Sequence, residues 1–137
     1  MFASARPTLG SLDGFDEKAL TGVLREALKA GEGLLLHQER ESRRGVFVAK
    51  RSFESLVRQQ AATGPMFVLQ KRARDIRELE FSNTSTFVFS DHLSMPKKTD
   101  KFLLRLGAEP ISVGPKMLFA SQCITLVHNE LDRLDLP

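Results

Sequence analysis

The sequence predicts an α/β fold in which a mostly parallel sheet carries helices on both faces. Short apolar strands alternate with amphipathic helices along the 137 residues, and this alternation is typical of strand–helix–strand units. Glycine–proline pairs at Gly64–Pro65 and Gly114–Pro115 mark the ends of two such segments. The length and the 42% hydrophobic content indicate one ordinary core. We therefore expect a single domain over residues 1–137.

The N-terminal part of the chain contains one predicted helix between segments without clear periodicity. Residues 1–14 carry Gly, Pro and Ser and are predicted to form a loop. Asp16 is expected to cap a helix over residues 17–30, because Asp is a favoured N-cap residue. Residues 33–36 fit a helix or a strand by pattern alone, and the charged residues 37–44 predict a solvated loop. The apolar face of the helix consists of Leu20, Val23, Leu24, Ala27 and Leu28.

The middle of the chain predicts two strands with a helix between them. Residues 45–49, GVFVA, are a short β-branched and aromatic run typical of a strand. Ser52 is expected to cap a helix that continues to about Ala61. Residues 66–69, MFVL, form a continuous apolar run that predicts a buried strand. The polar residues 70–80 fit a hairpin arm or a loop.

The C-terminal part predicts strand, helix, strand and helix in that order. Residues 84–90, TSTFVFS, have the pattern of a strand, and the next helix opens at Met95–Pro96, since proline is favoured in a first helical turn. This helix is expected to run to about Leu106. Residues 111–113 are an apolar strand, which breaks at a glycine into one long helix from Lys116 onward.

Three turns follow predicted strands and are candidates for a ligand site. In open parallel sheets, ligands bind beyond the carboxyl ends of the strands. The turns at Leu69–Lys71, Ser90–Leu93 and Val113–Leu118 stand at such ends. Gly114 allows the backbone to approach a ligand closely, and the first N–H groups of the following helix lack intrahelical partners. We expect this strand–glycine–helix segment to be the centre of the site.

Composition and motifs exclude several classes of function. The 20 Lys and Arg against 17 Asp and Glu give a net charge of +3, which permits nucleic-acid binding without requiring it. The absence of GxGxxG and Walker loops argues against a dinucleotide or ATP enzyme. No spacing matches a zinc motif, so no metal is expected. No apolar run approaches a membrane span, and the single cysteine suits a reducing compartment, so we expect a cytoplasmic protein.

Basic side chains flank two of the predicted strand ends and are candidates for contacts with RNA phosphates. Acidic residues such as Glu41 and Asp75 are interleaved with them, so an ordinary solvated surface explains the same pattern. The candidates are Arg43, Arg44, Lys50, Arg51, Lys71, Arg72 and Arg74.

Two blocks of the sequence resemble a known family. FVFSDHLSMPKK and RLGAEPISVGPKMLFASQCITLVHNELD are similar to the archaeal tRNA pseudouridine-54 N1-methyltransferases and to their bacterial relatives, with which MPKK and HNELD agree best. The family belongs to the SPOUT superfamily of knotted methyltransferases. The resemblance is densest over Thr86–Asp132 and extends more loosely upstream, but the N-terminal strands of the family domain have no counterpart.

The resemblance implies an S-adenosylmethionine-dependent enzyme that methylates N1 of a pseudouridine in tRNA. It also implies a C-terminal trefoil knot that holds the cofactor, and a homodimer. A non-catalytic knotted module for dimerisation or RNA binding is the alternative within the same family. By matching motif positions, the cofactor contacts are Leu69, Ser90, Asp91, His92, Val113, Gly114, Met117, Leu118 and Cys123.

Three residues of this set are candidates for a chemical role. The acceptor nitrogen of pseudouridine must lose a proton, and a carboxylate or a histidine can accept it, so Asp91 and His92 are the local candidates. Of these two, Asp91 is the candidate catalytic residue. An Asp at a strand end is also a common turn former, which is the competing interpretation. Cys123 has no neighbouring basic group to lower its pKa, since His128 points elsewhere on the helix. We therefore expect Cys123 to line the cofactor pocket or the core rather than to act as a nucleophile.

Overall fold

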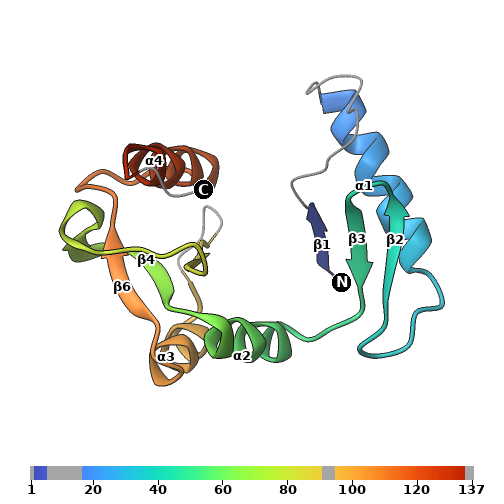
Figure 1. The fold of residues 1–137 in the computed structure, drawn as a ribbon, viewed down its shortest axis with the longest axis horizontal. Coiled ribbons are helices and arrows are strands. Elements are labelled where there is room, and N and C mark those ends of the chain that lie inside the picture. The colour runs from blue at the N-terminus through green and yellow to red at the C-terminus, as the bar shows by residue number, and fades with distance from the viewer. Residues whose placement is uncertain (1, 6–16, 91–94, 135–137) are drawn as a thin grey trace. The chain divides into compact units, whose positions relative to one another are not determined.

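A computed structural model describes residues 2–5, 17–90 and 95–134 (Figure 1). The chain divides into two compact units, Met1–Leu56 and Val57–Pro137, and each unit contains a sheet of its own. Within the described ranges, no helix is both long and apolar enough to cross a bilayer.

The first unit is an antiparallel sheet packed against one helix. Its strands stand in the order β1–β3–β2, and the central strand β3 is largely buried. Arg43 pairs with Val46 across a tight turn in which Gly45 has φ +80°. Glycine adopts positive φ at little cost, so this residue allows the hairpin to close. The elements are β1 (Phe2–Ala5), α1 (Glu17–Gly31), β2 (Glu39–Arg43) and β3 (Val46–Ala49).

The predictions for the first unit are right for α1 and β3 and wrong for two strands. β1 lies within residues 1–14 and β2 lies within residues 37–44, where we predicted loops. β2 reads ERESR and shows no apolar alternation, because an exposed edge strand has little to bury. Its pairing with β3 holds it in place, and this pairing is antiparallel rather than parallel. The predicted cap Asp16 lies outside the described residues.

The second unit contains the parallel sheet that the sequence predicts. Its strands stand in the order β5–β4–β6, and both neighbours run parallel to β4. β4 continues well beyond the predicted apolar run 66–69. The predicted trefoil knot and missing N-terminal strands stay predictions. The elements are α2 (Phe53–Thr63), whose first turn belongs to the first unit, β4 (Met66–Asp75), the 3₁₀ turn η1 (Ile76–Glu78), β5 (Thr86–Val88), α3 (Lys97–Arg105), β6 (Glu109–Ser112) and α4 (Ala120–Arg133).

Helices flank the parallel sheet on both faces, because alternate residues of its strands point to opposite sides. Phe67 and Ile111 are buried in one cluster with Val127 of α4. On the opposite face, the Gln70 side chain donates a hydrogen bond of 2.7 Å to Asp100 of α3. Figure 1 shows α4 and α3 separated by the strands. The helix-covered parallel sheet is thus confirmed for this unit.

The helix ends depend on capping hydrogen bonds. Ser52 caps α2 as predicted, since its Oγ accepts the N–H of Ser55 at 3.1 Å. α4 begins at Ala120, later than the predicted start at Lys116. The Gln122 side chain accepts a hydrogen bond of 2.9 Å from the backbone N–H of Phe119, and this bond fixes the first turn of α4. Apolar spacing alone extended the predicted helix too far towards the N-terminus.

Leu103 and Leu104 are adjacent on α3 and test where the core of the second unit lies. Leu103 is fully buried, whereas Leu104 is 39% exposed. We expect Leu103→Ala to lower the free energy of unfolding of this unit by about 2–5 kcal/mol, because the change leaves a cavity. The control Leu104→Ala should cost less than about 1 kcal/mol. Urea unfolding followed by far-ultraviolet circular dichroism measures both, and equal losses would contradict this placement of the core.

Candidate active site

The carboxyl ends of the three parallel strands meet at one edge of the sheet. Val68 of β4 is in register with Val88 of β5 and with Pro110 of β6. Leu69 is in register with Ile111, so the apolar part of β4 ends at about the level where β5 and β6 end, while β4 itself continues to Asp75. Ligands of open parallel sheets bind at such an edge. We call residues 69–71, 89–90 and 112–114, which lie at this level of the three strands, the carboxyl edge.

Hydrogen bonds of Ser112 connect two of these segments, residues 69–71 and 112–114. Its Oγ accepts the N–H of Gly114 at 3.2 Å and lies 3.1 Å from the carbonyl oxygen of the same glycine. The Oγ is also 3.4 Å from the carbonyl oxygen of Lys71 on β4. The side chain is almost fully buried, so these bonds satisfy its hydroxyl and fix the turn. We did not predict this role, although a serine two residues before a glycine is a turn signal.

Gly114 is the position at the carboxyl edge where glycine is required. Its φ of +131° is a conformation that residues with a side chain rarely adopt. A Cβ added to Gly114 would meet no atom within 4 Å, so the space beside this backbone is open. A ligand at the edge can therefore approach the Gly114 backbone closely.

A hydrogen bond joins the carboxyl edge to α3. The Gln70 Nε2 donates to Asp100 Oδ1 at 2.7 Å, and both side chains are half-buried. Asp100 lies in the first turn of α3. The bond therefore holds the first turn of this helix beside the end of the apolar part of β4. Sequence analysis missed both residues, because a polar pair separated by a long stretch of chain leaves no local pattern.

The structure brings together some of the predicted cofactor contacts. Leu69 and Val113 both pack against the buried cluster that includes Phe67 and Val127. Ser90 follows β5 at the level of the same edge and is half-buried. These residues, with Gly114, come from three different strands, as the sequence predicted.

The remaining predicted contacts lie farther along the chain or outside the described residues. Met117 is 77% exposed, whereas Leu118 and Cys123 are half-buried. Cys123 stands in the first turn of α4, where its N–H donates to the carbonyl oxygen of Phe119 at 3.0 Å. Asp91 and His92 fall on residues that the structure does not describe.

Burial raises the pKa of the Cys123 thiol above its ordinary value. A catalytic nucleophile needs the opposite shift, because the thiolate is the reactive form. The direction of the shift agrees with our expectation that Cys123 forms part of a wall. Among the described residues, no His or Lys lowers its pKa.

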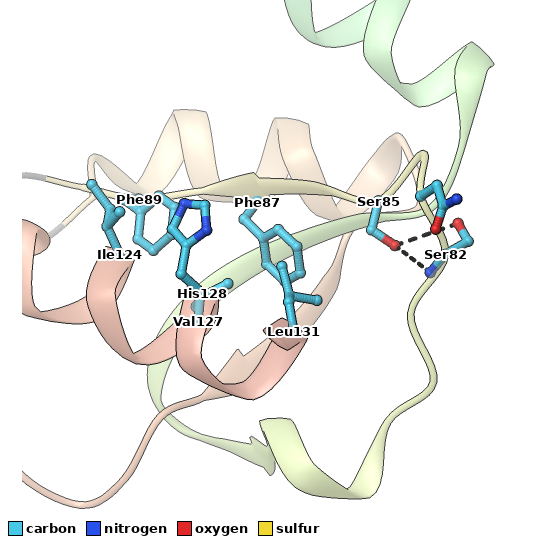
Figure 2. Close-up of a pocket in the computed structure, with 9 residues that line it drawn as sticks. Ser82, Ser85, Phe87, Phe89, Ile124, Val127, His128 and Leu131 are labelled. Atoms are coloured by element: carbon cyan, nitrogen blue, oxygen red, sulfur yellow. Dashed lines mark hydrogen bonds between the residues drawn. The ribbon is translucent and has the colours of Figure 1, made fainter. Parts of the chain in front are cut away.

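A separate cavity of about 220 Å³ lies between β5 and α4 (Figure 2). Phe87 and Phe89 face Ile124 and His128 of α4 across it, and Ser85 stands at one end. The walls are mainly apolar. Among the predicted cofactor contacts that the structure describes, none lines this cavity, although Phe89 of the carboxyl edge does.

The structure divides the predicted RNA contacts into paired and exposed cations. Arg44, Lys50, Lys71 and Arg72 are exposed, and no ion pair with another described residue engages them. The other three candidates form ion pairs, Arg43 with Glu26, Arg51 with Glu39 and Arg74 with Glu109. Within the described ranges, no group of three or more His, Cys, Asp or Glu side chains is placed to hold a metal ion.

Comparison with known proteins identifies the family. Residues 11–136 match the family described as "Putative SAM-dependent RNA methyltransferase". The chain belongs to this family. It is also similar to three bacterial proteins that are each named "Putative pseudouridine methyltransferase", which confirms the predicted resemblance.

The similarity to these relatives covers most of this chain and part of theirs. The Shewanella frigidimarina protein is 43% identical over 124 residues, which are 90% of this chain and 63% of that protein. The Photobacterium profundum protein is 46% identical over 122 residues, with shares of 89% and 62%. The Vibrio campbellii protein is 43% identical over 122 residues, with shares of 89% and 61%. The chain thus spans about three fifths of the length of these relatives.

Alkylation kinetics of Cys123 test whether this thiol only lines the pocket or the core, or is an activated nucleophile. Because burial raises its pKa, we expect iodoacetamide to react more slowly with the folded protein than with the unfolded chain at neutral pH. The rate of alkylation should rise only as the pH passes above the ordinary pKa of a thiol. Cys123 is the only cysteine, so mass spectrometry of the intact protein follows one site. Faster reaction in the folded protein would assign a stabilised thiolate to Cys123.

Proposed function

We propose that this protein is an S-adenosylmethionine-dependent methyltransferase that methylates N1 of a pseudouridine in tRNA. The observation that carries the proposal is the family match over residues 11–136. The names of the relatives, "Putative pseudouridine methyltransferase", support the choice of nucleoside. The parallel sheet supports it further, because its strand ends form an edge where a ligand of this size is normally bound.

The carboxyl edge suits S-adenosylmethionine. Gly114 leaves open space beside its backbone, and only a residue without Cβ leaves that space free. Ser112 and Lys71 hold the two neighbouring segments at a fixed separation through the Ser112 hydroxyl. The proposed contacts are Leu69, Ser90, Asp91, His92, Val113, Gly114, Met117, Leu118 and Cys123.

The cofactor would supply an electrophilic methyl group, so the protein has mainly to bind and orient. Leu69 and Val113 offer an apolar wall, and the Gly114 backbone offers close contact. The acceptor nitrogen carries a proton that must leave during transfer. Asp91 follows β5 directly after Ser90 and is the proposed proton acceptor.

We further propose that the chain forms one knotted SPOUT domain over residues 1–137 and acts as a homodimer in the cytoplasm. Two exposed apolar residues of the second unit, Met117 and Phe119, are consistent with a partner subunit, since large apolar side chains at the surface often mark contacts.

A non-catalytic RNA-binding or dimerisation module of the same family is the second candidate. The observation that favours it is the cavity between β5 and α4, which is lined by none of the proposed cofactor contacts in the described part of the chain. A module of this kind would bind RNA without transferring a methyl group.

A methyl-transfer assay separates the two candidates. We expect the protein to bind S-adenosylmethionine in isothermal titration calorimetry and to transfer a radiolabelled methyl group to tRNA that contains pseudouridine. An unmodified tRNA transcript, which contains uridine in place of pseudouridine, is the control and should stay unlabelled. No heat of binding from folded protein would contradict the enzyme and favour the non-catalytic module.

Two glycine variants test the placement of the cofactor. We expect Gly114→Val to abolish binding of S-adenosylmethionine, because the side chain would fill the space beside the edge and strain the backbone. Gly107 also has a positive φ, +90°, and lies at the opposite end of β6. Gly107→Val therefore imposes similar strain, of about 1–3 kcal/mol, away from the site. Calorimetry should show binding by the Gly107 variant alone, and binding by a folded Gly114 variant would show that the site lies elsewhere.

A further inference from the structure

One face of α3 carries only positive charge. Lys97, Lys101 and Arg105 are spaced four residues apart, and Lys98 lies beside them. At 3.6 residues per turn these four side chains occupy an arc of about 100° on the helix. Leu103, which is fully buried, lies on the opposite side of the helix. All four cations are exposed, and we call this face the α3 stripe.

The α3 stripe differs from the two basic segments predicted to contact RNA, because each of those segments contains at least one arginine in an ion pair. Among the described residues, no carboxylate pairs with any of its four cations. Arg43, Arg51 and Arg74 of the predicted RNA contacts each have a glutamate partner. The only acidic residue of α3 is Asp100, which accepts a hydrogen bond from Gln70. No negative charge of the helix is therefore interleaved with the stripe.

The four charges of the stripe exceed the net charge of +3 of the whole chain. Removing its four cations from the 20 Lys and Arg leaves 16 against 17 Asp and Glu. Like charges held close together on one helix face repel one another. A concentration of this kind attracts a polyanion, whereas mixed charges of equal number do not.

The position of the stripe connects it to the carboxyl edge. The hydrogen bond between Gln70 and Asp100 holds the first turn of α3 beside the end of the apolar part of β4. Lys71 and Arg72, which follow Gln70 directly, are exposed. Beyond the other flank of the stripe, the Arg58 guanidinium of α2 lies 5.2 Å from the centre of the Phe102 ring. Exposed cations therefore occur at the carboxyl edge, on α3 and on α2.

We propose that the α3 stripe binds the phosphodiester backbone of the RNA substrate and so positions the target nucleoside at the carboxyl edge. The proposal rests on the proposed function, in that it takes the substrate to be RNA. Three of the four cations are lysines, which act as point charges towards phosphates. Contacts to phosphates fix register and affinity but carry no base sequence. The choice of nucleoside therefore lies with the carboxyl edge.

Neutral variants test the stripe without breaking the helix. The triple variant Lys97→Gln, Lys101→Gln and Arg105→Gln removes three charges, and Gln has nearly the same helix propensity as Lys and Arg. The matched control is Lys18→Gln, Arg25→Gln and Lys29→Gln, which removes the same charge from exposed residues of α1. Circular dichroism verifies the fold of both variants.

Fluorescence anisotropy with a labelled tRNA transcript, repeated over a series of KCl concentrations, is the measurement. We expect the stripe variant to bind tRNA roughly tenfold more weakly or worse, and the slope of log affinity against log salt to fall by about 2 to 3. The α1 control should bind within about twofold of the unchanged protein, because it leaves the phosphate contacts intact.

Three outcomes would overturn the proposal. The first is a stripe variant that binds tRNA as well as the unchanged protein does. The second is an equal loss in the α1 control, which would indicate a general charge effect. The third is polyglutamate of matched charge competing as effectively as RNA, which would indicate an acidic protein partner. Titration with S-adenosylmethionine distinguishes this inference from the proposed function. If tRNA binding is lost only in the stripe variant and the unchanged protein does not bind S-adenosylmethionine, the stripe remains an RNA-binding surface. The proposed methyl transfer is then contradicted.

Discussion

The parallel pairing of β4 with both of its neighbours is the constraint on which the second unit depends. Because β5 and β6 run in the same direction as β4, their carboxyl ends must lie at one edge. Segments that are distant in sequence therefore meet there without any direct attraction between them. The same pairing directs alternate side chains to two helical layers, so Phe67 packs towards α4 while Gln70 reaches α3.

Side-chain hydrogen bonds fix the positions of the segments that the strand pairing brings to the carboxyl edge. Ser112 is nearly buried, yet its hydroxyl is satisfied by the turn at Gly114 and by Lys71. Gln70 and Asp100 make a comparable bond on the other face of the sheet. Buried or half-buried polar groups of this kind cost stability when they lose a partner. They hold the edge in one arrangement, which is what a site needs if it must orient a reacting group.

The sequence predicted the elements that bury apolar faces and missed those that do not. β3, the apolar part of β4, and β6 were recognisable because their side chains are buried. β2 was not, since it is a largely exposed edge strand whose pairing with β3 and polar side-chain contacts leave no apolar pattern in the sequence. For the site, motif positions and strand ends indicated Gly114 and Leu69, whereas the Gln70–Asp100 bond and the α3 stripe depend on three-dimensional proximity and on the pairing of charges. Ion pairs decide which basic residues remain available, and no sequence pattern records them.

The register of β4 affects where this sequence can tolerate insertions and deletions. Both Leu69 and Arg74 pair with Ile111 of β6. Residues 70–73 therefore form a bulge, an excursion of β4 that begins and ends opposite the same residue. A bulge of this kind can lengthen or shorten without shifting the strands on either side of it. The excursion carries Lys71 and Arg72 beside the strand ends. It therefore offers a place where the reach and charge of the surface that we propose to contact RNA can be altered by insertion or deletion, while the sheet beneath keeps its packing.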